Sequence, residues 1–97
     1  MKCYSDFDMQ DISDTLAMIS QVNRLQIICL LGQSAELNVC EIYKKLNIKQ
    51  NLVSHHLKLL KNIWILKSRK DWQKVFYSIN EKFYDEFKIS LKNILSI

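Results

Sequence analysis

Apolar residues recur at helical spacing in the first third of the chain and predict two helices. Apolar positions at i, i+4 and i+7 behind acidic residues indicate one helix at roughly residues 9–19. The segment from about 22–32 is apolar on nearly every side and stops near Gly32, the chain's single glycine. We expect this second helix to be the buried centre of the fold and its Cys29 to be a small core residue.

Two short helices separated by three residues follow. Asn38 can cap a helix together with Glu41 in a capping-box arrangement, and the inward apolar stripe of that helix runs to Leu46. After a break at residues 47–49, the segment 50–62 carries apolar residues on one narrow face and hydrogen-bonding residues on the opposite face. Two short helices of this kind, the second with a polar face, are typical of a helix-turn-helix.

The C-terminal third predicts a β-hairpin and a final helix. Residues 63–69 and 74–79 have the composition of strands, and the basic segment 70–73 joins them. Asn80 can cap a helix that runs to about residue 95 and has a broad apolar stripe that no later segment covers. The pattern therefore predicts a mainly α fold with a small β-hairpin, in which the first and last helices form a subunit interface.

Composition narrows the class of protein. A chain of 97 residues is long enough for one domain, which we place over residues 1–97 with a short N-terminal tail, and its core is thin unless it oligomerises. Hydrophobic residues at 48% and charged residues at 25% exclude disorder, and no apolar run approaches the length of a membrane span. The N-terminus lacks the apolar stretch of a secretory signal, so we expect a cytoplasmic protein with no membrane partner.

The net charge of +4 is unevenly distributed along the chain. Residues 44–74 contain nine Lys or Arg against Asp71 alone, a net charge of +8, whereas residues 1–21 contain Lys2 against four Asp, a net charge of −3. A basic half of this size favours a polyanionic partner, because each phosphate that is neutralised releases condensed counterions. A solvated charged surface is the plainer alternative.

The polar face of segment 50–62 and the hairpin supply the candidate DNA contacts. Gln and Asn side chains can pair with adenine through two hydrogen bonds, whereas Ser and His bond bases or phosphates less selectively. A metal site at the adjacent histidines is not expected, because neighbours in a helix point about 100° apart and no acidic or thiol partner lies one turn away. The predicted DNA-binding residues are Gln50, Asn51, Ser54, His55, His56 and Lys58 of the helix and Arg69, Lys70 and Lys74 of the hairpin.

Several local strings resemble the ArsR/SmtB family of metal- and redox-responsive repressors. Residues 23–28 (NRLQII) are similar to the opening of the family's second helix, and residues 36–42 (ELNVCEI) to its ELCVCDL segment. Residues 50–60 (QNLVSHHLKLL) resemble its recognition helix, commonly QSTVSRHLKVL, and residues 67–69 and 74–80 resemble its wing strands. The resemblance implies a homodimeric winged helix-turn-helix repressor that places two recognition helices on a near-palindromic operator in double-stranded DNA.

The chain departs from the family at the effector sites. Asn38 takes the place of the first cysteine of the family's Cys-X-Cys pair and leaves Cys40 alone, and residues 81–97 lack the His of a related zinc site. Relatives that sense persulfides pair a cysteine at the position of Cys29 with one in the last helix, which has none here. One thiolate does not make a high-affinity soft-metal site by itself, but Cys3 on the tail can supply Cys40 with a second sulfur, as in relatives with such a site. The resemblance therefore implies a thiol sensor at these cysteines, with a soft metal or metalloid ion as the candidate ligand.

Two glycines of the family pattern are replaced by tryptophan in this chain. Trp64 follows the recognition helix, and Trp72 lies at the wing tip. A residue other than glycine in the left-handed conformation costs free energy, so we expect both turns to be reshaped. The sequence leaves open whether Trp72 is an exposed stacking residue or is tucked under the sheet.

The sequence favours a DNA-binding repressor that blocks polymerase and is released by a metal, metalloid or thiol-redox inducer. Two alternatives stay open. One is a DNA-binding regulator that keeps the scaffold and responds to no effector, and the other is a winged-helix module whose wing and helix bind an acidic protein. An enzyme is not expected, because no Ser/His/Asp set, phosphate-cradling glycines or paired catalytic carboxylates stand out.

Overall fold

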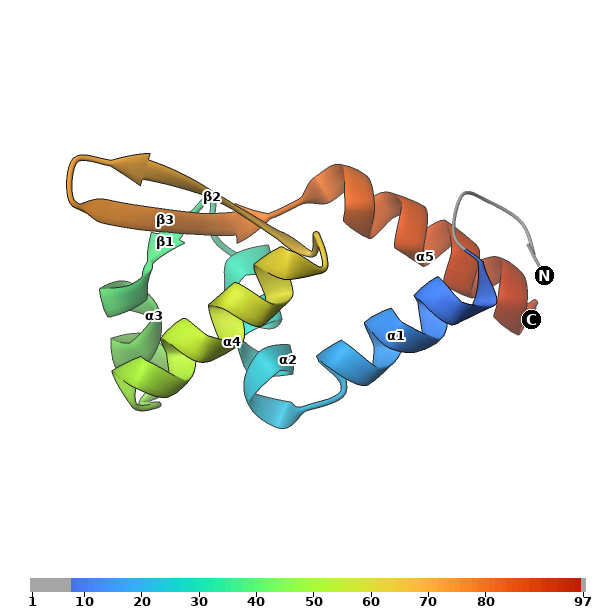
Figure 1. Cartoon of the computed structure of the whole chain (residues 1–97), viewed down its shortest axis with the longest axis horizontal. Helices are drawn as coiled ribbons and strands as arrows, with labels where there is room; N and C mark the ends of the chain where they lie inside the picture. The colour runs from blue at the N-terminus through green and yellow to red at the C-terminus, as the bar shows by residue number, and fades with distance from the viewer. Residues whose placement is uncertain (1–7, 97) are drawn as a thin grey trace.

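The structure, a computed structural model, describes residues 8–96 as a series of helices interrupted by a small sheet (Figure 1). Its elements occur in the predicted order, with one addition, a two-residue strand before the third helix. The predicted mainly α class with a β-hairpin is confirmed. The elements are α1 (Met9–Ile19), α2 (Val22–Gly32), β1 (Leu37–Asn38), α3 (Val39–Leu46), α4 (Gln50–Asn62), β2 (Leu66–Asp71), β3 (Lys74–Ile79) and α5 (Glu81–Leu95).

Polar side chains fix the ends of the short helices. The predicted capping box is present at α3, where the Asn38 side chain accepts from the Glu41 N–H at 2.9 Å and the Glu41 carboxylate accepts from the Asn38 N–H at 3.0 Å. Asn47 ends α3 in the left-handed conformation with φ 54°, which asparagine tolerates better than most residues. The chain therefore turns within three residues into α4.

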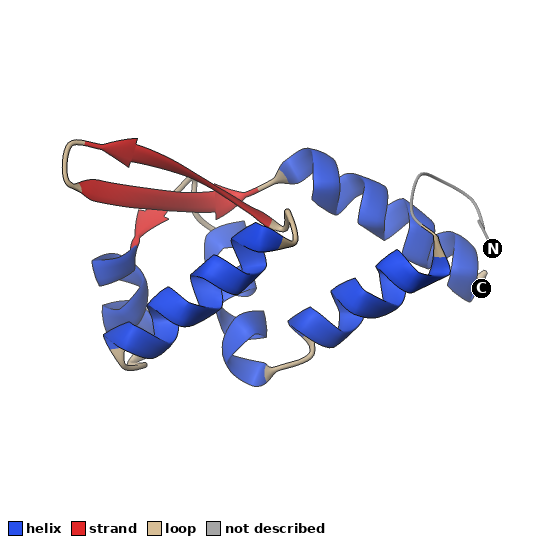
Figure 2. Ribbon diagram, in the orientation of Figure 1, coloured by secondary structure: helices blue, strands red, loops and turns tan. Residues whose placement is uncertain are grey.

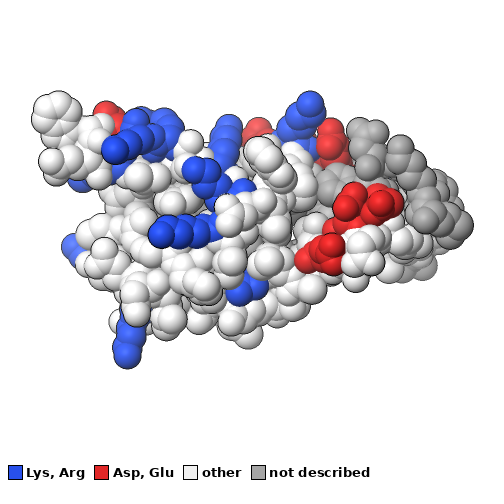
Figure 3. Space-filling model, in the orientation of Figure 1, with Lys and Arg blue, Asp and Glu red and all other residues white. Residues whose placement is uncertain are grey.

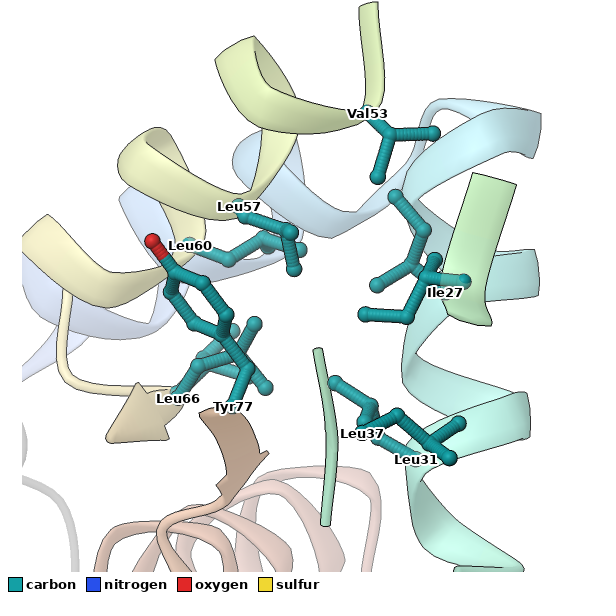
Figure 4. Close-up of a cluster of buried hydrophobic side chains, with 10 residues drawn as sticks. Ile27, Leu31, Leu37, Val53, Leu57, Leu60, Leu66 and Tyr77 are labelled. Atoms are coloured by element: carbon teal, nitrogen blue, oxygen red, sulfur yellow. The ribbon is translucent and has the colours of Figure 1, made fainter. Parts of the chain in front are cut away.

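One hydrophobic cluster holds α2, α3, α4 and the sheet together. Figure 4 shows its side chains converging from α2, from α4 and from the strands. Complete burial of a Leu or Ile side chain contributes on the order of 2 kcal/mol each, so this cluster dominates the stability of the fold. Its buried members are Ile27, Leu31, Leu37, Ile42, Val53, Leu57, Leu60, Ile65, Leu66 and Tyr77.

Only one side of α2 belongs to this cluster. Ile27 and Leu31 are buried, as predicted for a central helix, but Val22 and Leu25 are exposed within the described chain. The prediction that Cys29 is a core residue is wrong, because its side chain is exposed. Cys29 lies two positions beyond Ile27, which at about 100° per residue places it on the opposite side of the helix. No single helix within residues 8–96 is long and apolar enough to cross a membrane; α1 and α2 meet that test only as a pair, bent by 94°.

The helices α1 and α5 lie side by side at the end of the molecule away from the hairpin (Figure 1). Ile12 of α1 and Phe87 of α5 form a second small core. Part of the predicted apolar stripe of α5 is thus covered by α1 of the same chain. Other large apolar side chains of the two helices stay exposed: Met9, Leu16, Ile89 and Leu95.

The sheet is antiparallel, with the strands in the order β1-β3-β2 (Figure 2). The strand predicted at 63–69 is shifted: it begins at Leu66, because residues 63–65 complete the turn out of α4, and it continues to Asp71. Residues 70 and 71, predicted to lie in the loop, pair instead with Val75 and Lys74. The hairpin is therefore longer than predicted, and its turn is reduced to two residues.

The two tryptophans that replace family glycines keep the left-handed backbone. The φ angle is 72° at Trp64, between α4 and β2, and 61° at Trp72, the first residue of the hairpin turn. A positive φ at the first of two turn residues alone is the pattern of a type II′ turn, where glycine is usual. The expectation that these turns are reshaped is wrong, since the chain accepts the steric cost instead.

Arg24 joins three helices at one point. Its Nη1 donates to the carbonyl oxygen of Met18 at the end of α1, at 3.0 Å, and its Nε donates to Nδ1 of His56 in α4, at 3.2 Å. His56 is 4% exposed. Burial, followed by the charges of Arg24 and His55, lowers the pKa of His56 below its ordinary 6.5. A neutral His56 is therefore part of the folded structure, because a protonated Nδ1 cannot accept this bond.

We predict that Trp64→Gly is more stable than Trp64→Ala by about 1 kcal/mol, since glycine adopts a positive φ without the steric cost that any Cβ brings. The Trp64 side chain is 68% exposed, so both variants lose little packing. Urea unfolding of the two variants measures the difference. Equal free energies of unfolding would show that this turn carries no backbone strain.

We predict that the free energy of unfolding falls as the pH is lowered from 7.5 to 5.5. Because the pKa of His56 is lower in the folded than in the unfolded state, the unfolded chain binds more protons once the pH drops below about 6.5. His56→Gln keeps an acceptor for Arg24 but cannot titrate there, so it flattens this dependence. The exposed His55→Gln is the control: it removes only the last of the three causes of the His56 shift, so most of the wild-type dependence on pH should remain. Parallel profiles of urea midpoint against pH for all three proteins would contradict this assignment.

Candidate nucleic-acid interface

The helix α4 presents one polar face because its opposite face is fixed in the core. Val53, Leu57 and Leu60 are fully buried. Five of the six DNA contacts predicted on this helix lie together on the other side and line one surface groove: Gln50, Asn51, Ser54, His55 and Lys58. Apart from Ser54, which is half-buried, these side chains are exposed. Their amide, hydroxyl, imidazole and ammonium groups form a continuous set of hydrogen-bond donors and acceptors.

His56, the sixth residue predicted on the helix, does not belong to this face. Its side chain is buried, and its Nδ1 accepts from Arg24. One position of helix, about 100°, separates it from the exposed His55. His56 is therefore a residue that holds α4 in place, and its predicted contact with DNA is withdrawn.

Arg69 is held by carboxylates within the protein. Its Nε donates to both carboxylate oxygens of Glu36, at 3.0 and 2.9 Å, and its Nη2 donates to the same group. Its Nη1 lies 3.6 Å from a carboxylate oxygen of Asp71, and its guanidinium carbon lies 4.8 Å from the centre of the Phe76 ring. Hydrogen bonding in the Glu36–Arg69 pair lowers the pKa of Glu36 and raises that of Arg69. Arg69 therefore ties the hairpin to the segment before β1, and we no longer count it as a free cation for DNA.

The other two hairpin residues predicted to bind DNA are exposed. Lys70 and Lys74 lie on β2 and β3, one on each side of the turn. Figure 3 shows Lys and Arg atoms gathered over the hairpin and the surface beside it, whereas Asp and Glu atoms gather over α1 at the other end. The charge asymmetry predicted from the sequence is thus an asymmetry between the two ends of the molecule.

The cysteines do not form a metal cluster among residues 8–96, where no group of three or more His, Cys, Asp or Glu could hold an ion. Cys40 is exposed in the first turn of α3 and lines a cleft with Gln50 of α4 and Lys74 of β3. Cys29 is exposed on α2, at the edge of a separate cleft against α5. Cys3 lies outside the described residues, so the ligand set proposed for Cys40 stays a prediction.

Sequence reasoning missed two residues of the groove and the partner of Arg69. Tyr43 and Lys49 also line the groove of α4. Tyr43 lies in α3, within the span of the predicted inward stripe, but its side chain is only half-buried, as expected for an aromatic residue with a polar end. Lys49 stands immediately before α4, where its basic charge was a usable signal. Glu36 is 33 positions from Arg69, and no local pattern links them.

Comparison with known proteins places these features in one family. A family model described as bacterial regulatory protein, arsR family, matches residues 21–63, from the residue before α2 to the residue after α4. The chain is 31% identical over 77 residues to the arsenical resistance operon repressor of Staphylococcus aureus, and the match covers 79% of this chain and 73% of that protein. It is 33% identical over 72 residues to a cadmium resistance transcriptional regulatory protein CadC homolog of Staphylococcus aureus, covering 74% of this chain.

The solved structures extend the similarity beyond the helix-turn-helix. The transcriptional repressor PagR of Bacillus anthracis matches with a TM-score of 0.70 at 29% identity, over 84% of this chain and 93% of that chain. The chain spans about 60% of the length of the CadC homolog. These proteins are described as transcriptional regulators, in agreement with the expectation that the chain is not an enzyme. The resemblance of the local strings is confirmed, and the chain belongs to the arsR family of bacterial regulatory proteins.

Proposed function

We propose that this protein binds double-stranded DNA sequence-specifically and represses transcription from the site that it occupies. The observation that carries the proposal is the groove of α4, which is lined by four exposed hydrogen-bonding side chains and the half-buried Ser54, while Val53, Leu57 and Leu60 on the opposite face are fully buried. A helix held in this way can enter the major groove and present amide groups to adenine edges. The basic hairpin beside it supplies contacts to phosphates, which position the helix on the duplex.

The proposed functional unit is a homodimer. Large apolar side chains of α1 and α5 are exposed at the end of the molecule away from the hairpin. A second copy that covers this surface through a two-fold axis leaves both α4 helices free and places them on successive major grooves of a near-palindromic operator. Such a dimer represses by blocking access of polymerase to the promoter.

We predict that Asn51→Ala/Ser54→Ala lowers the preference for a selected duplex over random duplex by about 10- to 100-fold, because the loss of one bidentate base contact, that of Asn51, costs about 1–3 kcal/mol. The selected duplex is the sequence that wild-type protein enriches from a random pool, and fluorescence anisotropy measures both affinities. Gln33→Ala/Ser34→Ala removes an exposed amide and a half-buried hydroxyl from the loop after α2, outside the groove of α4 and outside α1 and α5, and serves as the control.

The salt dependence separates the DNA-binding function from binding to an acidic protein. Wild-type affinity for duplex DNA should fall steeply with salt, because counterions are released from each neutralised phosphate. Retention of full sequence preference by the α4 double variant contradicts the assignment of the recognition surface. Failure of wild-type protein to enrich any duplex contradicts the proposed function itself and favours the protein-interaction alternative.

The proposed inducer acts on Cys40. This thiol is exposed in the cleft between the start of α3, Gln50 of α4 and Lys74 of the hairpin. A soft metal, a metalloid or an oxidised sulfur at this point changes the charge between the recognition helix and the wing. The descriptions of two relatives, an arsenical resistance repressor and a cadmium resistance regulator, support soft-metal and metalloid inducers.

We predict that at least one of cadmium, arsenite, peroxide and persulfide weakens binding to the selected duplex about tenfold or more, within the usual range of allosteric coupling. Cys40→Ser should bind DNA normally and lose that response. Cys29→Ser replaces the other exposed thiol among residues 8–96 and should respond as wild type does. A wild-type protein that is insensitive to all four agents, or a Cys40→Ser protein that still responds, contradicts the role of Cys40.

A further inference from the structure

The most exposed large apolar side chain among the described residues is Trp72, at the tip of the hairpin. It is 87% exposed, although tryptophan is usually highly buried in folded proteins. Trp72 begins a two-residue turn between the paired Asp71 and Lys74. The hairpin thus ends in an indole ring that is almost entirely in water.

The folded chain gains little from tryptophan at this position. Its φ of 61° lies in the region that glycine adopts freely and that other residues enter at a steric cost. The exposed ring does not repay that cost by packing within residues 8–96. We therefore interpret the exposed indole ring as a contact surface for another molecule.

The basic residues near Trp72 indicate that the molecule it contacts is a polyanion. Lys70 and Lys74 are exposed on the two strands that lead into the turn. Behind them, Arg69 is bonded to Glu36 and lies over the Phe76 ring, so the hairpin is anchored to the body of the protein. The tip is held on a basic projection at the end of the molecule opposite to α1 and α5 (Figure 1). A rigid basic projection that ends in an aromatic ring suits the minor groove, where apolar wedges enter between cationic contacts to the two backbones.

We propose that Trp72 is a wedge that enters the minor groove of DNA flanking the sequence read by α4, with Lys70 and Lys74 on the phosphates beside it. The proposal rests on the proposed DNA-binding function and adds a second reading element to it. Contact with the sugars and base edges of the minor groove transfers the indole out of water. Because a wedge deforms the duplex, it favours flanking sequences that are easily deformed. Trp72 is then a determinant of affinity for the flanks and has no role at the core of the operator.

Tryptophan fluorescence tests the contact directly. The chain has two tryptophans, so Trp64→Phe leaves Trp72 as the single emitter. Saturation with the selected duplex, carrying long flanks on both sides, should quench or blue-shift its emission. The same duplex trimmed to the core should bind and leave the emission as it is in free protein.

Affinity measurements test whether the contact contributes to binding. Trp72→Gly relieves the left-handed backbone and keeps the turn, so the variant should be at least as stable as wild type. Its affinity for the long duplex should fall about tenfold, as for loss of an aromatic contact with nucleic acid, and its affinity for the trimmed duplex should not change. Trp64→Gly is the matched control at the other end of the hairpin and should bind both duplexes as wild type does. Trp72→Phe, which keeps an aromatic ring, should retain most of the affinity.

The outcomes separate this proposal from the function on which it rests. If Trp72→Gly binds the long duplex as tightly as wild type, or if the emission of Trp72 is unchanged at saturation, the wedge is wrong while DNA binding through α4 stands. A shift of emission with anionic lipid vesicles and none with DNA also overturns it. If wild-type protein enriches no duplex at all, the proposed DNA-binding function is wrong, and the proposed role of Trp72 is wrong with it.

Discussion

Three residues of α4 have no exposed surface: Val53, Leu57 and Leu60. They pack in the same core as Ile27 and Leu31 of α2, and this contact fixes the rotation of α4 about its own axis. Because the buried stripe is narrow, a large part of the helix surface remains for polar groups that need no partner in the protein. The groove of α4, and every function that depends on it, follows from where this stripe lies.

The position of the hairpin relative to α4 depends on different forces. The base of the hairpin is in the core through Leu66 and Tyr77, but its outer half has little apolar surface to bury. In that outer half, polar contacts hold the hairpin in place: the pair between Arg69 and Glu36, and the ring of Phe76 below Arg69. An exposed ion pair alone adds little stability, but a bidentate pair backed by an aromatic ring restricts geometry well. This explains how a hairpin with so much positive charge keeps one orientation beside α4.

The sequence correctly predicted the features that depend on residues close together in the chain. The bounds of α1, α2 and α4 and the capping box of Asn38 follow from spacing that is visible within one or two turns. Three of the failures share a cause, because each depends on contacts between distant segments. The strand β1 exists only because β3 lies beside it, Cys29 is exposed because α2 is covered on one side, and His56 is buried because Arg24 reaches it from another helix. The backbone at Trp72 was mispredicted for another reason: its steric cost was recognised, but the tolerance of the fold for it was not.

The contact between Arg24 and His56 links the two ends of the molecule. Arg24 donates to the end of α1, which packs against α5, and also to the interior side of α4. A displacement of α1 that breaks the bond to Met18 costs the half-buried Arg24 guanidinium one of its hydrogen bonds. The contact therefore favours movement of α2 and α4 together with α1, and in the proposed homodimer it would couple the spacing of the two α4 helices to the packing of the terminal helices. The narrow apolar stripe sets which face α4 presents, and this polar contact sets where that face is held.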